Sequence, residues 1–158
     1  MSLSTRLQSH SWDCALDPEI SPAFLALQWA QRQSLDGMLP LLRQFGLSHA
    51  EFDVLATLRN ASPPHELTPS QIQAEVVITS GGLTKVMAQL ETRGLVERSQ
   101  HAADLRVKPV RLSEQGQQCV ERAMEQMMAN TGRWLRTALT RDEIAQLTHL
   151  LSKLLPAD

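Results

Sequence analysis

Residues 68–98 read TPSQIQAEVVITSGGLTKVMAQLETRGLVER, and this stretch decides the fold. Its first residues predict a capped helix start, with the Thr68 hydroxyl as the cap and Pro69 at the first helical position. Gln71 comes three residues after the cap, so its side chain can reach back to the cap residue. The short helix that follows is predicted to have one apolar face, formed by Ile72, Val76 and Val77.

A second helix is predicted to begin at Thr79–Ser80 and to end at Arg93–Gly94, a cation followed by a glycine that can cap the helix end. Its apolar face is formed by Leu83, Val86, Met87 and Leu90. Two short helices this close together, with apolar faces that must meet, are typical of a helix-turn-helix.

Two short strands are predicted after these helices, over residues 95–98 and 106–112, with a loop around residues 102–104 between them. They form a hairpin, or wing, beside the second helix. Glu66–Leu67 is predicted to add a minimal third strand to the wing. Residues 47–112 therefore read as a winged helix-turn-helix, a structure suited to lie on DNA.

The charge distribution agrees with this interpretation. The whole chain has a net charge of −2, from 15 basic and 17 acidic residues, which taken alone argues against a nucleic-acid binder. The positive charge is concentrated in residues 79–112, which carry six basic and three acidic side chains. A local basic stripe is what contact with phosphates requires. A solvated surface with chance clustering is the alternative.

The rest of the chain is predicted to be helical. One helix should run from Ser21–Pro22 to Phe45, with a kink or split at Pro40 and an end at Gly46. The other expected helix starts are capping residues, at Ser48 with Glu51, at Ser113, and at Thr140 with Glu143. The fold class is thus mainly α with a small antiparallel β wing, and residues 1–20 are a polar leader.

Composition sets further bounds. The 158 residues, of which 42% are hydrophobic, are enough for one core. We expect no membrane span and no signal peptide, and the two distant cysteines, Cys14 and Cys119, suit a reducing cytoplasm. The sequence predicts no metal site and no cofactor.

The last helix is predicted to carry a wide apolar stripe, formed by Ile144, Leu147, Leu150, Leu151, Leu154 and Leu155. The small winged core cannot cover it, so we expect residues 21–46 and 113–158 to form the dimerisation helices of a two-fold homodimer. An intramolecular bundle of these helices is the alternative. A dimer would read a roughly palindromic duplex with half-sites about one helical turn apart.

Several motifs resemble the multiple-antibiotic-resistance-regulator (MarR) family. They are LSHAEFDVL at residues 47–55, LTP at 67–69, GLTK at 82–85, LETRGLVER at 90–98, DLR at 104–106 and LSEQG at 112–116. The resemblance covers about residues 20–155. It implies a homodimeric winged-helix transcription regulator, usually a repressor, whose DNA affinity is altered by a small molecule or an oxidant.

The expected DNA contacts come from both helices and the wing. On the second helix Lys85 can reach guanine or phosphate, while Thr79 can also serve only as a cap. In the wing, Arg106 matches the family's minor-groove arginine and Asp104 would orient it, with a plain surface salt bridge as the alternative. The full predicted set is Ser70, Gln71, Thr79, Ser80, Thr84, Lys85, Arg98, Asp104, Arg106 and Lys108.

The sequence does not identify the effector or the residues that would bind it. Trp12, Trp29 and Phe52 could line a ligand pocket, but ordinary core packing is the alternative. Cys14 could serve a thiol-based redox sensor, although it lies upstream of the family's sensing cysteine. A zinc site at His49 and Glu51 has no further support in the sequence.

Three function classes follow. A DNA-binding transcription regulator leads. A winged-helix module that binds proteins instead of DNA is second, and a basic recognition face argues against it. An enzyme is the least favoured, because the sequence has no nucleophile elbow, P-loop or metal motif.

Overall fold

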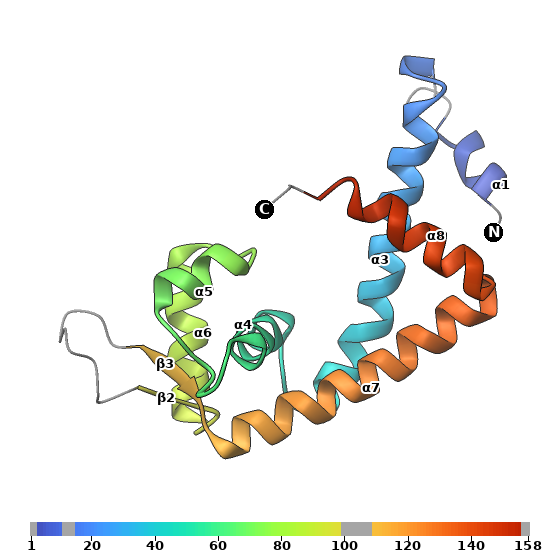
Figure 1. Ribbon diagram of the computed structural model, residues 1–158. Helices are drawn as coiled ribbons and strands as arrows, with labels where there is room; N and C mark the ends of the chain where they lie inside the picture. Colours follow the sequence, from blue (N-terminus) through green and yellow to red (C-terminus); the bar gives the residue numbers. More distant parts are fainter. Residues whose placement is uncertain (1–2, 11–14, 99–108, 156–158) are drawn as a thin grey trace. The chain divides into compact units, whose positions relative to one another are not determined.

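The structure is a computed structural model that describes residues 3–10, 15–98 and 109–155 (Figure 1). The chain divides into two compact units, Met1–Met38 and Leu39–Asp158. The described part is mainly helical with one small antiparallel sheet, which confirms the predicted fold class.

The first unit holds α1 (Leu3–Gln8) and the beginning of α3 (Ile20–Gln44). The α3 helix begins one residue before the predicted Ser21, because the Asp17 carboxylate accepts hydrogen bonds from the backbone N–H groups of Glu19 and Ile20, each at 3.0 Å. Pro40 lies inside α3, which continues through it as one helix, so the split that the sequence allowed is not seen. A proline removes only one backbone hydrogen bond, and the neighbouring bonds remain.

Gly46 ends α3 in the left-handed backbone region, with φ of 65°, as predicted. The next helix, α4 (His49–Asn60), begins with the predicted capping box: the Ser48 side chain accepts from the backbone of Glu51, and the Glu51 carboxylate accepts from the backbone of Ser48. The inner face of α4 is the centre of the core and is formed by Phe52, Val54, Leu55 and Leu58.

The first helix of the motif, α5 (Pro69–Glu75), has the predicted Thr68 cap with Gln71 closing the capping box. Ile72 and Val76 are buried as expected. The assignment of Val77 to the same face was wrong, since its exposed fraction is 106%. The helix ends at Glu75 and Val76 is already extended, so helical spacing no longer applies at position 77.

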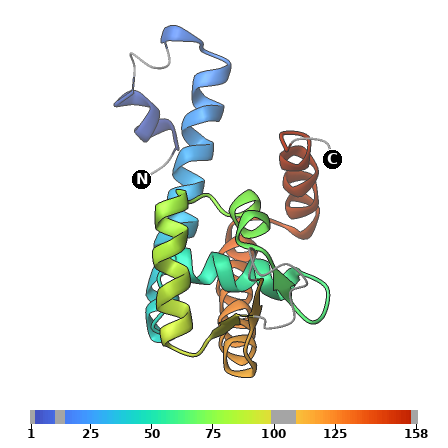
Figure 2. The same ribbon diagram turned by 90° about the vertical axis from the view of Figure 1, so that its left-hand side faces the viewer.

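The second helix, α6 (Ser80–Thr92), begins at the Thr79 cap and is followed by Gly94 at φ of 67°. The four residues predicted for its inner face are all buried: Leu83, Val86, Met87 and Leu90. Both α5 and α6 contact α4, which holds the two helices of the motif in place (Figures 1 and 2).

The sheet has three short strands, β1 (Glu66–Leu67), β2 (Val96–Arg98) and β3 (Val110–Leu112), in the order β1-β3-β2. Both pairings are antiparallel, which confirms the wing and its added first strand. Residues 99–108, between β2 and β3, lie outside the described part of the chain.

The long helix α7 (Glu114–Ala138) is fixed to the core by Ser113. The Ser113 hydroxyl accepts a hydrogen bond from the Gly116 N–H at 2.9 Å and donates one to the Gly94 carbonyl at 2.6 Å. Gly116 is needed at this contact, because an added Cβ would collide with the backbone carbonyl of Leu95. The buried side chains of α7 include Val120, Ala123 and Met127.

The last helix, α8 (Arg141–Ser152), has the predicted capping box at Thr140 and Glu143 but buries none of its residues. Its leucines remain exposed, with exposed fractions of 50% at Leu150 and 71% at Leu154, just beyond the helix. An apolar face of this kind is not part of the core of the single chain.

Candidate nucleic-acid interface

The N-terminal end of α6 is an exposed polar surface held in place by its cap. The Thr79 hydroxyl accepts a hydrogen bond from the Gly82 N–H at 3.2 Å, so Thr79 does act as a cap. Ser80, Thr84 and Lys85 are all exposed on the first turns of the helix. The Thr84 hydroxyl donates to the Ser80 carbonyl at 3.0 Å, which fixes the orientation of that side chain.

Four of the predicted DNA-contacting residues line one groove. It lies between α5, α6 and β2 and has a volume of about 450 Å³. Leu83 and Met87 contribute its buried apolar side chains. The predicted residues in it are Ser70, Ser80, Thr84 and Arg98.

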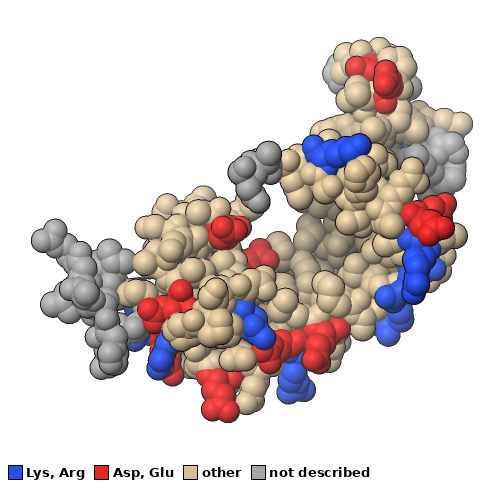
Figure 3. Space-filling view, in the orientation of Figure 1, with Lys and Arg blue, Asp and Glu red and all other residues tan. Residues whose placement is uncertain are grey.

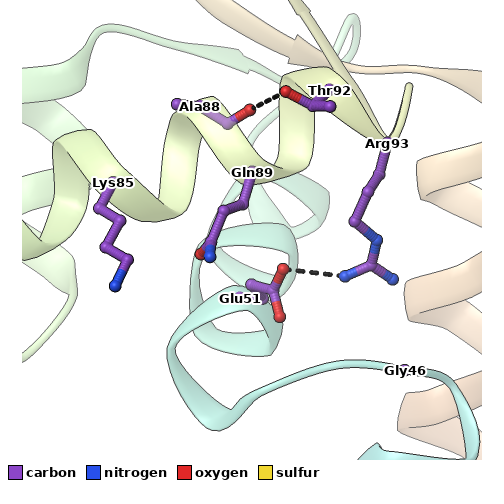
Figure 4. Close-up of a pocket in the computed structure, with 7 residues that line it drawn as sticks. All are labelled: Gly46, Glu51, Lys85, Ala88, Gln89, Thr92 and Arg93. Carbon is purple, nitrogen blue, oxygen red and sulfur yellow. Dashed lines mark hydrogen bonds and ion pairs between the residues drawn. The ribbon is translucent and has the colours of Figure 1, made fainter.

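Lys85 lies on a different side of α6. It lines a second groove, of about 580 Å³, together with Gln89, Thr92, Arg93 and Glu51 (Figure 4). Neighbouring residues on a helix point about 100° apart, and here Thr84 lines the first groove and Lys85 the second. The exposed start of α6 therefore presents the Ser80 and Thr84 hydroxyls to one groove and the Lys85 ammonium group to the other.

Gln71 belongs to neither groove and lines a third, with Thr57, Asn60 and Glu75 among its neighbours. Its Oε1 accepts hydrogen bonds from the Thr68 N–H at 2.8 Å and from the Thr68 hydroxyl at 3.0 Å. The structure thus assigns the carbonyl end of this side chain to the helix cap.

Three of the four described basic side chains of the predicted stripe are paired with acids. Arg98 Nε lies 2.6 Å from Glu91 Oε1, and Arg111 Nη2 lies 2.8 Å from Glu97 Oε2. On the winged core, the visible face of Figure 3 shows basic and acidic side chains beside one another. Of the four described cations in residues 79–112, only Lys85 has no described carboxylate within 4.0 Å.

An ion pair between the buried Glu51 and the exposed Arg93 positions α6 against α4 (Figure 4). The Glu51 carboxylate accepts from Arg93 Nη1 at 2.8 Å and from the Ser48 N–H at 2.8 Å. Burial alone would raise the pKa of Glu51, but the hydrogen bonds from Ser48 and the charge of Arg93 outweigh it and lower that pKa. Glu51 is thus the link that fixes where the end of α6 lies. The capping box predicted the Ser48 contact, and no sequence signal indicated Arg93.

Several expected site residues lie outside the described part of the chain, namely Asp104, Arg106, Lys108, Trp12 and Cys14. The other cysteine, Cys119, is half-buried on α7. Burial raises the pKa of its thiol, although Arg93 and Arg122 oppose this effect. A raised pKa disfavours the reactive thiolate at neutral pH.

The zinc site at His49 and Glu51 finds no support. His49 Nε2 lies 3.5 Å from the Asp53 carboxylate, and the Glu51 carboxylate is engaged by Ser48 and Arg93. Within residues 3–10, 15–98 and 109–155, no three His, Cys, Asp or Glu side chains are grouped as metal ligands. Among the same residues no helix is both long and apolar enough to cross a bilayer.

Comparisons with known proteins agree with this geometry. The sequence model described as MarR family matches residues 47–108, a range that includes α4, β1, α5, α6 and β2. The Escherichia coli multiple antibiotic resistance protein MarR is 30% identical over 115 residues, which are 73% of this chain and 78% of that protein. The chain belongs to the MarR family. An HTH-type transcriptional regulator of Bacillus cereus is 32% identical over 112 residues, 71% of this chain and 72% of that protein.

One of the similar solved structures contains DNA. A mutant of Escherichia coli MarR in complex with operator DNA matches with a TM-score of 0.73 and 28% sequence identity, over 87% of this chain and 96% of that one. The chain is therefore a winged-helix, DNA-binding MarR family transcription regulator, and the family consists of regulators rather than enzymes.

Proposed function

We propose that this MarR family regulator is a homodimeric repressor that binds a roughly palindromic duplex through α6 and the wing and leaves it when a small-molecule effector binds. The observation that carries the proposal is the exposed start of α6, where Ser80, Thr84 and Lys85 stand on a rigidly held helix. A structural neighbour with the same fold was solved on operator DNA. A rigid helix that offers hydroxyls and one cation suits insertion into the major groove.

The dimer is supported by two exposed apolar faces. One is the α8 face with Leu147, Leu150 and Leu151, and the other is the N-terminal part of α3, with Ile20 and Phe24 exposed by 59% and 56%. Burial of such faces against a second copy would remove them from water. We therefore assign residues 21–46 and 113–158 to dimerisation and residues 47–112 to DNA binding.

The helix caps leave hydrogen-bond donors for phosphate. Thr79 uses its oxygen to accept from Gly82, and Gln71 uses its Oε1 to accept from Thr68. The Thr79 O–H and the Gln71 Nε2–H₂ are therefore not consumed by the caps, and phosphate oxygens require donors. Both residues, with Ser70, are assigned to backbone positioning.

The remaining contacts are assigned by chemistry. Lys85 is proposed to contact a base edge or phosphate, and Arg98 a phosphate beside the 450 Å³ groove. For the wing, we retain the assignment of Arg106 to the minor groove, with Asp104 as its positioning residue and Lys108 on the backbone.

The test is capture of genomic fragments by the purified protein, followed by anisotropy measurements on the captured duplex at several salt concentrations. We expect specific binding whose log–log slope is about −0.9 for each neutralised phosphate. Addition of small molecules to the complex would then identify an effector by release of the duplex. Failure to enrich any duplex, or affinity that does not depend on salt, would point to the protein-binding alternative.

A further inference from the structure

The first unit contains a built contact that the DNA-binding function does not use. In it, α1 lies beside the N-terminal part of α3 (Figures 1 and 2). The Arg6 guanidinium carbon lies 5.4 Å from the centroid of the Trp29 ring, a cation–π distance. The His10 ring contacts the same indole edge-to-face, with centroids 5.4 Å apart and planes at 60°. The two side chains from the α1 region therefore fix the half-buried indole from two directions.

A hollow of about 260 Å³ lies at this contact. Its α3 side is formed by Arg32, Gln33 and Asp36, which follow Trp29 by three, four and seven residues and so share its helix face. Two guanidinium groups, those of Arg6 and Arg32, thus line one small hollow with a single carboxylate. No described carboxylate lies within 4.0 Å of either guanidinium, so their charge is not neutralised by an ion pair in the described chain.

The hollow faces away from the apolar side of α3. Nine residues separate Ile20 from Trp29, about two and a half helical turns, so the two side chains leave opposite sides of the helix. A second copy that covers Ile20 and Phe24 would leave the Trp29 side open. The hollow is therefore compatible with the proposed dimer and does not depend on it.

We propose that this hollow is a binding site for a small organic carboxylate that also carries a hydroxyl group. The guanidinium groups of Arg6 and Arg32 match the geometry of a carboxylate and bind it with charge-assisted hydrogen bonds. The Asp36 carboxylate and the Gln33 amide oxygen accept hydrogen bonds, so they favour a ligand with an O–H donor. The Trp29 indole supplies the apolar wall.

The fluorescence of Trp29 gives a direct test. The chain has three tryptophans, so W12F and W134F together leave Trp29 as the sole indole. Titration of this protein with malate, a hydroxy-dicarboxylate that does not absorb near 280 nm, should give a saturable change in emission. Sodium chloride at matched ionic strength and the uncharged malamide should give none.

Variants locate the site. Arg32→Gln should weaken the response to malate about tenfold or more, since it removes charged hydrogen bonds. Arg43→Gln is the matched control, because Arg43 is exposed on the same helix but does not line the hollow, and it should leave the response unchanged. Asp36→Asn should reduce the preference for malate over succinate, which lacks the hydroxyl.

Calorimetry of the unmodified chain keeps the test independent of the tryptophan substitutions. Heat of binding with malate that saturates below about 10 mM supports the site. No saturable heat or emission change in this range, an equal response to inorganic phosphate, or equal losses in the Arg32 and Arg43 variants would overturn the proposal. None of these readouts requires DNA, so failure here leaves the proposed regulatory function to its own test.

Discussion

Two of the capping boxes in the described chain, those that a glutamate closes, begin helices that differ in burial. At the start of α4, Ser48 and Glu51 are tied into the core, since Glu51 is buried and also accepts from Arg93. At the start of α8, Thr140 and Glu143 make the same reciprocal bonds, yet α8 buries none of its residues. The same local motif therefore begins a core helix and a helix whose apolar face is uncovered in the single chain. The winged core buries its own apolar faces, whereas the apolar face of α8 is exposed in the single chain, and we propose that a second copy covers it.

The largest effect is expected where α7 joins the winged core. Gly116→Ala places a Cβ against the Leu95 carbonyl, which is backbone and cannot swing away. We expect a loss of about 3 kcal/mol or more in the free energy of unfolding, measured by urea denaturation. Gly81→Ala is the control, because an added Cβ there meets open space, and it should change stability by less than about 1 kcal/mol. Similar stability losses in the two variants would contradict the tight joint at Gly116.

The next effect concerns the uncovered face. Leu150→Glu changes a side chain that is 50% exposed in the single chain, so an isolated subunit should tolerate it. If the face is buried by a second copy, the dimer should dissociate about a hundredfold more readily. Sedimentation equilibrium measures the dissociation constant of the dimer. Ala145→Glu serves as the charge control, because Ala145 is exposed on the same helix and is not three or four residues from any member of the leucine stripe. A monomeric wild-type protein would contradict the proposal that a second copy covers the α8 face.

A smaller effect on stability is expected from replacing the glutamates of the two capping boxes, which compares them directly. The pKa of Glu51 is lowered in the folded state, so this group stabilises the fold above the ordinary glutamate pKa and loses that contribution as pH falls through the lowered value. Glu51→Gln should cost about 1–2 kcal/mol at pH 7 and flatten the acid side of the stability curve.

Glu143→Gln is the matched variant for that measurement. The pKa of Glu143 is also lowered, by the backbone and side-chain hydrogen bonds with Thr140, but the carboxylate is fully exposed. We expect a clearly smaller change from it in urea titrations across pH 3–7. Equal losses in both variants would show that the link to Arg93 adds nothing.

The smallest expected effect is on DNA binding and comes from Lys85, which is exposed on α6. Lys85→Ala should leave the fold intact and reduce the salt slope of duplex binding by about one, if the ammonium contacts phosphate. Lys153→Ala, just beyond α8, is the control. An unchanged slope together with relaxed sequence preference would assign Lys85 to a base instead, and no change in either would remove it from the interface.

The parts of the fold that sequence could predict are those set by neighbouring residues. Capping pairs such as Thr68 with Gln71, and the apolar spacing of α6, depend on local geometry and are confirmed. Val77 was misplaced because the end of α5 depends on the tight turn that follows it, which spacing does not report.

The charge pairing illustrates what sequence could not give. Glu97 and Arg111 are partners in the β2–β3 register, so a fixed hairpin register would have revealed their pairing. The pairs of Glu51 with Arg93 and Glu91 with Arg98 join separate elements, and only the fold brings them together. Counting charges along residues 79–112 therefore overstated the positive charge available to DNA.

The most direct test is the mass of the complex between the protein and its captured duplex, measured by sedimentation velocity. The account predicts two chains on one duplex, with both Leu150→Glu and Lys85→Ala reducing the amount of that species. A single chain on the duplex, or a complex that both variants leave unchanged, would contradict it.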